Sequence, residues 1–472
     1  MRDSLVFYLN GQRQEIRCEA ALLNLAQWLR ERKRMKGTKV VCNEGDCGAC
    51  SVLVGRRDGD CFDYRPIDSC IAFPFQLDQT HVVTVEGLGQ DAELSAVQQA
   101  MVDCHGSQCG FCTPGFVATM HGMLEKQSAL TEESLRYGLS GNLCRCTGYV
   151  QIIDAGKSIA ADQVQPLNEV YPPEPILRDF DDLDDEVRIK VNDRVVFVPS
   201  TIDQVVETLS DHPNATMVAG ATDYGVIRNH GRDEPTDIIS LCSVADFDHI
   251  KIVDGSLRIG GGATWTDIEN FIQQSVPQYH KILTRFGSPQ IRNAGTLAGN
   301  LAGGSPIGDS IPFHMVMDSE LKLTGPDGVR TVKLCDFYTG YRQNVMTNAE
   351  LITEIITPLP KDDERLSLFK ISKRQDMDIS TETLGVWVKL DGEKVVDARV
   401  AIGGVGATVM RITNAEQSLI GATLSEESFR KAGEIVRKEI SPWSDVRGGD
   451  DYRLQLAENL MLKSFQELSQ PS

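Results

Sequence analysis

The sequence lacks any long hydrophobic run and any excess of positive charge. No apolar stretch approaches the length of a membrane span, and the first residues, MRDSLVFYLNGQRQEIRC, lack the apolar core of a secretory signal. Of 472 residues, 67 are Asp or Glu and 47 are Lys or Arg, which gives a net charge of −20. Nucleic acids and anionic membranes are polyanions, so this charge argues against both as partners. We therefore expect a cytoplasmic protein.

Cysteine is almost absent from the last two-thirds of the chain. Only Cys242 and Cys335, of 13 cysteines, lie beyond residue 150. Disulfides do not persist in a reducing compartment. Such an uneven distribution favours metal binding over disulfides, and both over coincidence, and it confines the thiol chemistry to the N-terminal region.

The pattern of hydrophobic residues predicts several α+β domains, because 472 residues exceed what one core usually serves. Asn10-Gly11 predicts a hairpin, and LLNLAQWLRER, CSVLVG and HVVTVEGL add a helix and strands in the order of a β-grasp domain. LSAVQQAMVDC, GFVATMHGMLEKQ and TEESLRYGLSG predict helices, the last with a capped start. Beyond residue 190, short strands and dense glycine give way to strands followed by two amphipathic helices.

The segment 171–186, YPPEPILRDFDDLDDE, contains three prolines and seven acidic residues. This composition predicts an extended linker that lies over the surface and buries little apolar area. We expect a β-grasp domain at 1–88, a helical domain at 89–165, an acidic linker at 166–189 and α+β domains at 190–346 and 347–466.

A first group of thiols lies in the stretch CNEGDCGAC. Cys42-x4-Cys47-x2-Cys50 is the plant-type [2Fe–2S] spacing, and a zinc knuckle, which usually has paired ligands, fits it less well. Gly45 and Gly48 allow the loop to curl so that backbone N–H groups point at the sulfurs. The spacing leaves open whether the fourth ligand is Cys61 or Cys70.

A second group of thiols consists of Cys109-x2-Cys112 and Cys144-x-Cys146, in QCGFCTPGFV and GNLCRCTGY. An apolar helix begins directly after Cys112, and the positive end of a helix dipole favours an anionic cluster. Taken alone, four such thiols could equally hold zinc.

Both groups, in this order and with the tails CGFCTPG and GNLCRCTGY, resemble the iron–sulfur domains of the xanthine oxidase family. The resemblance implies that two [2Fe–2S] clusters are bound, and it selects Cys70 over Cys61. The implied metal ligands are Cys42, Cys47, Cys50 and Cys70 for the first cluster and Cys109, Cys112, Cys144 and Cys146 for the second. It assigns no ligand role to Cys18, Cys61, Cys104, Cys242 or Cys335. One departure, Val150-Gln151 after the tyrosine of TGYVQI, lies outside the ligands.

Two glycine-rich stretches, MVAGATDYG and GSPQIRNAGTLAGNLAGGSPIGDS, lack both the G-x-G-x-x-G fingerprint and the P-loop lysine. Small residues there suit the approach of backbone amides to a pyrophosphate, but tight turns explain the glycines equally well. Both stretches are similar to the FAD-binding segments of the same family. The implied FAD contacts are Met217, Val218, Ala219, Gly220, Ala221, Thr222, Asp223, Tyr224, Phe286, Thr296, Leu297, Ala298, Gly299, Asn300, Asp309, Ile352 and Lys370.

The resemblance covers almost the whole chain and implies a multidomain α+β fold. Its parts are a ferredoxin-like β-grasp [2Fe–2S] domain, a helical-bundle [2Fe–2S] domain, a two-part FAD-binding domain and a C-terminal α+β domain. No catalytic acid or base is expected on this chain, because positioned cofactors perform the chemistry.

The implied function is electron transfer in a molybdenum hydroxylase of the xanthine dehydrogenase type. Electrons would pass from a molybdenum site through two clusters and FAD to NAD. The molybdenum cofactor is expected in a partner subunit, within a hetero-oligomer such as a dimer of heterodimers. Two alternatives remain: a relative that oxidises another N-heterocycle or an aldehyde, and a non-enzymatic iron–sulfur redox sensor with a degenerate flavin domain. Substrate, acceptor and oligomeric state cannot be read from this sequence.

Overall fold

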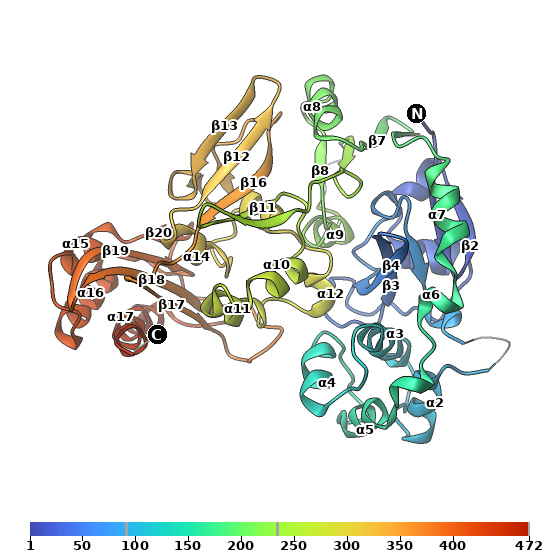
Figure 1. Ribbon diagram of the computed structural model, residues 1–472, viewed down its shortest axis with the longest axis horizontal. Coiled ribbons are helices and arrows are strands. Elements are labelled where there is room, and N and C mark those ends of the chain that lie inside the picture. The colour runs from blue at the N-terminus through green and yellow to red at the C-terminus, as the bar shows by residue number, and fades with distance from the viewer. Residues whose placement is uncertain (90–92, 233–235, 471–472) are drawn as a thin grey trace. The chain divides into compact units, whose positions relative to one another are not determined.

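The computed structural model describes residues 1–89, 93–232 and 236–470. The chain divides into two compact units (Figure 1). The first contains Met1–Ala245 and Gly287–Gly295, and the second contains Asp246–Phe286 and Thr296–Ser472. A short segment, 287–295, therefore joins the N-terminal unit although its neighbours in sequence belong to the other.

The first sheet has the strand order β2-β1-β5-β3-β4, with β1 and β5 parallel. Its strands are β1 (Leu5–Leu9), β2 (Gln12–Ile16), β3 (Ser51–Asp58), β4 (Cys61–Asp68) and β5 (His81–Val83). The predicted hairpin at Asn10-Gly11 is confirmed, and both residues have positive φ, as a tight two-residue turn requires. Side chains alternate: Phe7 packs on Trp28, whereas Val6 belongs to the core shared with the helical domain. Helix α1 (Leu25–Gln27) and the π-helical turn Trp28–Arg32 cover the Phe7 face.

The helical domain follows as predicted. Its helices are α2 (Ala96–Asp103), α3 (Thr113–Leu124), α4 (Glu132–Gly138) and α5 (Val150–Ser158). The Thr131 side chain caps α4 by accepting a hydrogen bond from the Ser134 N–H, which confirms the start signal. Helix α3 is buried along most of its length, and Gly122 lies against Leu53 of β3.

The acidic segment is not an extended linker, so that expectation was wrong. It forms α6 (Leu167–Val170) and α7 (Pro173–Asp181). Ile176, Leu177 and Phe180 of α7 are buried in the hydrophobic core that the first sheet shares with the helical domain. Glu174 and Asp181 are exposed on the opposite face of the helix, because apolar residues at i, i+1 and i+4 form one stripe. The high content of proline and acidic residues in the segment 171–186 had hidden this helical periodicity of its apolar residues.

The remainder of the first unit is a sheet with the order β6-β7-β9-β8. Its strands are β6 (Val187–Val191), β7 (Arg194–Val198), β8 (Thr216–Val218) and β9 (Ile238–Ser240). Its helices are α8 (Ile202–Asp211), α9 (Tyr224–Asn229) and α12 (Pro289–Arg292). Helix α12 lies within the segment 287–295.

The second unit contains an antiparallel sheet with the order β10-β11-β16-β12-β13. The strands are β10 (Ile250–Val253), β11 (Ser256–Gly260), β12 (Glu320–Gly325), β13 (Gly328–Lys333) and β16 (Leu351–Pro358). A small ribbon is formed by β14 (Tyr338–Gly340) and β15 (Gln343–Asn344). The helices that contribute to this part are α10 (Trp265–Ile272), α11 (Pro277–Leu283), α13 (Leu297–Gly303) and α14 (Ile311–Val316).

A second sheet in this unit has the order β17-β18-β19-β20. It is formed by β17 (Glu364–Ile371), β18 (Glu382–Asp391), β19 (Lys394–Gly403) and β20 (Met410–Arg411), and α15 (Thr413–Leu419), α16 (Glu426–Glu439) and α17 (Asp450–Leu468) follow. Val386 and Val388 face α15–α17, whereas Gly385 lies against Pro312 of α14 on the other face.

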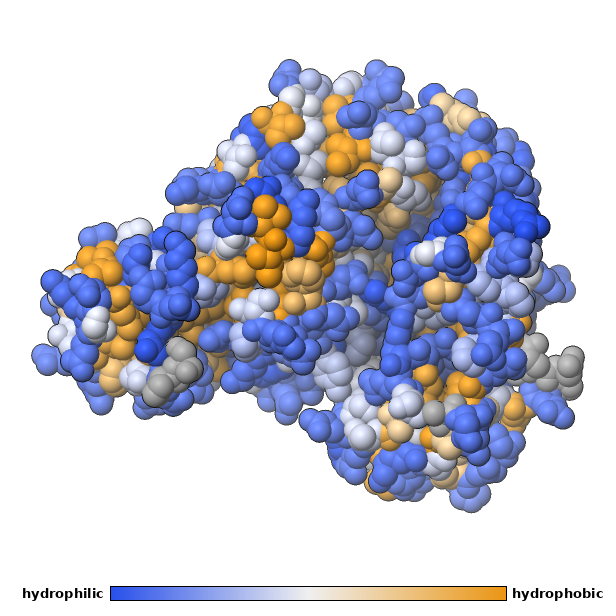
Figure 2. Space-filling view, in the orientation of Figure 1, coloured by the Kyte–Doolittle hydropathy of each residue, from blue (hydrophilic) through white to orange (hydrophobic). Residues whose placement is uncertain are grey.

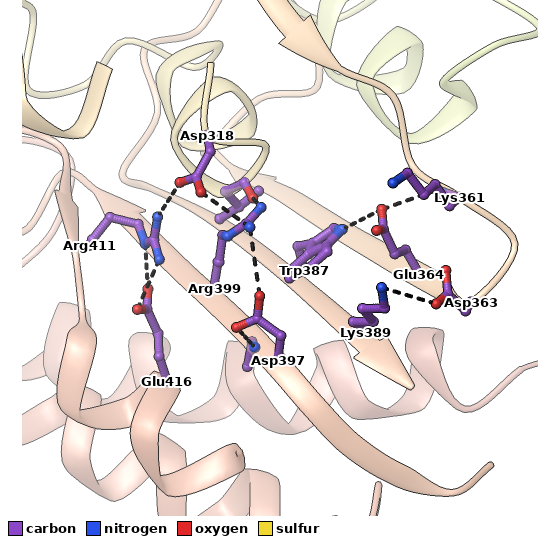
Figure 3. A network of polar contacts seen from close by, with 12 residues as sticks. Asp318, Lys361, Asp363, Glu364, Trp387, Lys389, Asp397, Arg399, Arg411 and Glu416 are labelled. Carbon is purple, nitrogen blue, oxygen red and sulfur yellow. Dashed lines mark hydrogen bonds and ion pairs between the residues drawn. The ribbon is translucent and has the colours of Figure 1, made fainter. Parts of the chain in front are cut away.

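A polar network ties the loop after α14 to the second sheet (Figure 3). Asp318 pairs with Arg411 at 2.9 Å and with Arg399 at 3.1 Å, and Arg411 also binds Glu416 of α15. The Arg399 guanidinium stacks 4.1 Å from the centre of the Trp387 ring. Arg411 thus connects β20, α15 and the loop after α14.

The visible surface is mostly hydrophilic, with smaller hydrophobic patches (Figure 2). Among the described residues, no helix combines the length and apolarity needed to cross a bilayer.

Candidate functional site: two thiol groups and two glycine-rich segments

The first thiol loop joins the turn after α1 to β3. Asn43, Gly45 and Gly48 all have positive φ, so the backbone curls back on itself. The N–H groups of Glu44 and Asp46 both point at the Cys42 sulfur, at 3.4 Å. The predicted role of the glycines in turning amides toward sulfur is therefore visible in the loop geometry.

The fourth thiol beside this loop is Cys70. It is buried and lies in hydrogen-bond contact with Cys42 and Cys50. Cys61 is exposed at the β3–β4 turn, where its thiol donates to the Asp58 carbonyl at 3.1 Å. The structure thus brings Cys70 to the loop and leaves Cys61 away from it.

The second thiol group lies between the start of α3 and the turn before α5. The Cys109 and Cys146 sulfurs are 3.6 Å apart, and Cys112 contacts Cys144. The Thr147 hydroxyl donates to the Cys144 sulfur at 3.3 Å. Cys109 and Cys146 are exposed, so this group lies at the surface of the first unit.

Within each group, the thiols perturb one another's protonation. Hydrogen bonds from the thiols of Cys47 and Cys70, with help from two backbone amides, hold the pKa of Cys42 far below its usual range. The hydrogen bond to Cys42 raises the pKa of Cys47 above its usual range. Burial raises the pKa of Cys112 to about 12. Thiols in contact cannot all ionise unless nearby cations neutralise them.

Each of the two groups offers four cysteine thiols as ligands. In the first group Cys42 contacts both Cys47 and Cys70, and Cys70 also contacts Cys50, so all four thiols are connected. Four cysteines are what a [2Fe–2S] cluster requires.

The backbones that carry the two groups are in direct contact. The N–H of Leu143, next to Cys144, donates to the Cys47 carbonyl at 3.0 Å. The Asn142 side chain donates to the Gly48 carbonyl at 3.1 Å. Gly115 of α3 has no room for a side chain, since a Cβ there would lie 2.1 Å from the Gly48 carbonyl oxygen.

The segment 287–295 adds a buried polar bridge to this contact. The Gln290 side-chain amide lies within hydrogen-bond distance of Ser51 (3.2 Å), Thr119 (3.2 Å) and Asn142 (2.9 Å). It therefore touches β3, α3 and the turn before the second thiol pair. Sequence reasoning assigned no role to Gln290 or Asn142, because no local pattern marks a contact between such distant segments.

The first glycine-rich stretch, residues 217 to 224, runs from β8 into α9 in the first unit. A Cβ at Gly220 would lie 1.9 Å from the Ala294 carbonyl oxygen, and Ala221 has a φ of 56°. The Ala219 carbonyl accepts hydrogen bonds from Gln76 (2.7 Å) and the Cys242 thiol (3.1 Å). This close-packed loop fits a backbone cradle for a pyrophosphate.

The other predicted FAD contacts lie in the second unit. Thr296 caps α13 by accepting from the Gly299 N–H at 3.1 Å, and Asn300 accepts from the Ser310 hydroxyl at 2.9 Å. Among described atoms, a Cβ at Gly299 would meet only the Thr296 hydroxyl, at 3.0 Å, and one at Gly303 would meet nothing within 4 Å. Residues 299 and 303 share one helix face, which therefore has open space beside it.

Asp309 and Lys370 form a buried ion pair, and the Ser380 hydroxyl also donates to Asp309, at 2.5 Å. Phe286 packs on Trp265 with ring centres 4.6 Å apart. Ile352 is buried in β16. The polar groups of this region could hydrogen-bond FAD, and the open space beside α13 could receive part of it.

Four family models match consecutive parts of the chain. They are a 2Fe-2S iron-sulfur cluster binding domain (residues 7–74), a [2Fe-2S] binding domain (84–157), an FAD binding domain in molybdopterin dehydrogenase (189–360) and a CO dehydrogenase flavoprotein C-terminal domain (367–468). Two of these models thus describe [2Fe-2S] binding domains, and the other two describe parts of flavoproteins. The predicted fold class is confirmed.

Similar proteins include xanthine dehydrogenase 1 of Arabidopsis thaliana and aldehyde oxidase 3 of Rattus norvegicus. Each is 27% identical over 98% of this chain, and the match covers 39% of the relative. The chain thus spans about two-fifths of the length of these relatives.

Among solved structures, the Cu,Mo-CO dehydrogenase in its cyanide-inactivated form matches with a TM-score of 0.55 and 25% identity, over 58% of this chain and 96% of that chain. Quinoline 2-oxidoreductase from Pseudomonas putida 86 matches with a TM-score of 0.53 and 23% identity, over 58% of this chain and 95% of that chain, which shows a shared fold.

Proposed function

We propose that this chain is the iron–sulfur and FAD subunit of a xanthine dehydrogenase, and that it carries electrons from the molybdenum site of a partner subunit toward NAD in the cytoplasm. The observation that carries the proposal is the hydrogen bond between the Leu143 N–H and the Cys47 carbonyl. It connects the two four-thiol groups through backbone atoms and one hydrogen bond, and this supports a role as two neighbouring one-electron carriers.

The residues of this chain would hold and tune the cofactors. Cys42, Cys47, Cys50 and Cys70 would bind one [2Fe–2S] cluster, and Cys109, Cys112, Cys144 and Cys146 the other. Such clusters supply one-electron transfer and FAD supplies the exchange between one and two electrons. The amides of Glu44 and Asp46, aimed at the Cys42 sulfur, would stabilise the anionic first cluster.

The FAD would be held by the backbone of residues 217–224 and 296–300 and by Phe286, Asp309, Ile352 and Lys370. The buried Lys370–Asp309 pair supports a polar role, because a buried ammonium retains donors beyond the one its carboxylate accepts. The open face at Gly299 and Gly303 supports close approach of a cofactor.

The second thiol group supports the proposal of a molybdenum-containing partner. Phe111, Leu143 and Val150, close in sequence to its cysteines, are exposed by 47%, 46% and 63%. Exposed apolar residues around an exposed thiol pair are typical of a surface that another protein covers. A permanent hetero-oligomer would fix the distance between cofactors on the two chains.

A second candidate is the equivalent subunit of an aldehyde-oxidising enzyme, because aldehyde oxidase 3 of Rattus norvegicus is as similar as xanthine dehydrogenase 1 of Arabidopsis thaliana. Co-expression of this chain with the molybdenum subunit from a neighbouring reading frame tests both candidates. We expect NAD⁺ reduction that depends on xanthine. Turnover of aldehydes but not xanthine would favour the second candidate, and xanthine oxidation by this chain alone would overturn the electron-transfer assignment.

A further inference from the structure

Helix α9, which directly follows the glycine-rich loop 217–223, lies against the first thiol group within the same unit. Gly225 is the point of closest approach: a Cβ there would lie 2.6 Å from the Ile71 carbonyl oxygen and 2.7 Å from the Ile71 Cβ. Ile71 adjoins Cys70 in sequence. Val226 packs on the buried group formed by Ala26, Cys50, Cys70 and Ile71. The start of α9 thus seals one side of the Cys50–Cys70 pair.

At the other end of α9, Asn229 binds the backbone on both sides of the first thiol group. Its side-chain NH₂ donates to the Asn43 carbonyl at 2.9 Å and to the Cys70 carbonyl at 2.8 Å. Its carbonyl oxygen accepts from the Asn24 side chain at 3.2 Å. Both ends of the amide are therefore used, and no other residue type of this size offers two donors and an acceptor in that geometry.

These two carbonyls belong to segments that are far apart in sequence. Asn43 follows Cys42 and has a φ of 61°, so it is one of the residues at which the thiol loop turns. The other carbonyl is that of Cys70 itself. One side chain thus controls the separation between the thiol loop and the only thiol of the group that lies outside it.

We infer that Asn229 is a positioning residue for the first thiol group. It clamps the Cys42 loop to Cys70 and ties both to α9, the helix that follows the glycine-rich loop 217–223. This inference rests on the proposed function, because it supposes that the four thiols hold a [2Fe–2S] cluster. Polar groups that orient metal ligands commonly change metal affinity by about 10- to 100-fold when they are removed.

The test compares Asn229→Asp and Asn229→Ala with wild type. Asn229→Asp keeps the size of the side chain but replaces the donor NH₂ by an oxygen that faces two carbonyl oxygens. Asn229→Ala removes both hydrogen bonds without that repulsion. Asn214→Asp, the same exchange in an exposed turn between α8 and β8, serves as the matched control.

Two measurements separate the first cluster from the second. One is the reduced-state EPR signal that disappears in Cys47→Ser, compared with the signal that disappears in Cys112→Ser. The other is the rate at which iron is lost to an Fe²⁺ chelator. We expect the Cys47-dependent signal to shift in both variants, with first-cluster iron released about tenfold faster in Asn229→Asp and less fast in Asn229→Ala. The Cys112-dependent signal and the control should match wild type.

A wild-type protein without two distinguishable signals would refute the proposed function itself. If wild type has both signals and both Asn229 variants keep the Cys47-dependent signal and iron release unchanged, the clamp is disproved while the function stands. Equal damage to both signals in Asn229→Ala would also disprove it, because a general loss of stability would then explain the effect. If Asn229→Asp does not accumulate, Asn229→Ala alone decides between these outcomes.

Discussion

Each group contains four thiols, and single substitutions can show which cysteines bind a cluster. Cys70→Ser should abolish the EPR signal of the first cluster, because a serine oxygen is a poor substitute for a soft thiolate. Cys61→Ser is the control: Cys61 is exposed and bonds to the Asp58 carbonyl, so both signals should survive. EPR spectra of the dithionite-reduced proteins give the answer, and the reverse result would transfer the fourth ligand to Cys61.

A buried histidine in the second unit makes stability depend on pH. His314 is fully buried and contacts the hydroxyls of Tyr279, Ser319 and Thr357 at 3.0–3.1 Å. Burial lowers the pKa of His314 to about 3, whereas an unfolded histidine titrates near 6.5. Between these values only the unfolded state gains a proton, so this site removes stability as pH falls.

His314→Gln should therefore lower the free energy of unfolding at pH 7, because the substitution removes hydrogen bonds of the buried imidazole. The difference from wild type should shrink as pH falls toward 5, because only wild type loses stability through this histidine. This difference in free energy of unfolding should change by at most about 1.4 kcal/mol per pH unit. Urea unfolding of both proteins at pH 5, 6 and 7 measures it. A deficit that stays constant across this range would show that His314 does not remain neutral in the fold.

At the scale of elements, Arg411 joins β20, α15 and the turn after α14. Glu416 is 5% exposed and receives two hydrogen bonds from this one guanidinium. Arg411→Ala should lower the free energy of unfolding by about 3 kcal/mol, because it leaves a buried carboxylate without its partner. Chemical denaturation followed by tryptophan fluorescence measures the loss.

Arg430→Ala provides the comparison, since Arg430 pairs with Glu426 one turn away on the exposed face of α16. That change should cost less than about 0.5 kcal/mol. Similar costs at the two positions would mean that the Glu416 environment is not what makes the Arg411 pair important.

The elements that sequence predicted well are those with local signals. The hairpin at Asn10-Gly11, the cap at Thr131 and the curled loop from Cys42 to Cys50 follow from neighbouring residues, and the structure shows each. Helix α7 was missed because its acidic composition hid an apolar stripe.

The clamp at Asn229 and the bridge at Gln290 were missed for a different reason. Asn229 binds partners 186 and 159 residues away, and Gln290 binds partners up to 239 residues away. Only the tertiary fold creates such contacts, so no periodicity or spacing in the sequence announces them.

At the scale of the whole molecule, both thiol groups and the Asn229 clamp on the first of them are built from elements of the first unit, whereas Gly299 belongs to the second. Loss of flavin should therefore leave the clusters intact. Gly299→Leu should lower FAD content, because its side chain would fill the space beside α13 that the structure leaves open.

That variant should keep about four irons and four acid-labile sulfides per chain, as two [2Fe–2S] clusters require, and both EPR signals after chemical reduction. It should lose the reduction of an artificial dye by NADH in proportion to its FAD, because in the proposed route NADH exchanges electrons with the flavin. Cys47→Ser should behave in the opposite way, retaining FAD and dye reduction while one signal disappears. Released cofactor that chromatographs as FMN would contradict the assignment of FAD. Joint loss of flavin and iron in Gly299→Leu would contradict the division between the two units, since each cofactor would then depend on the other for its site.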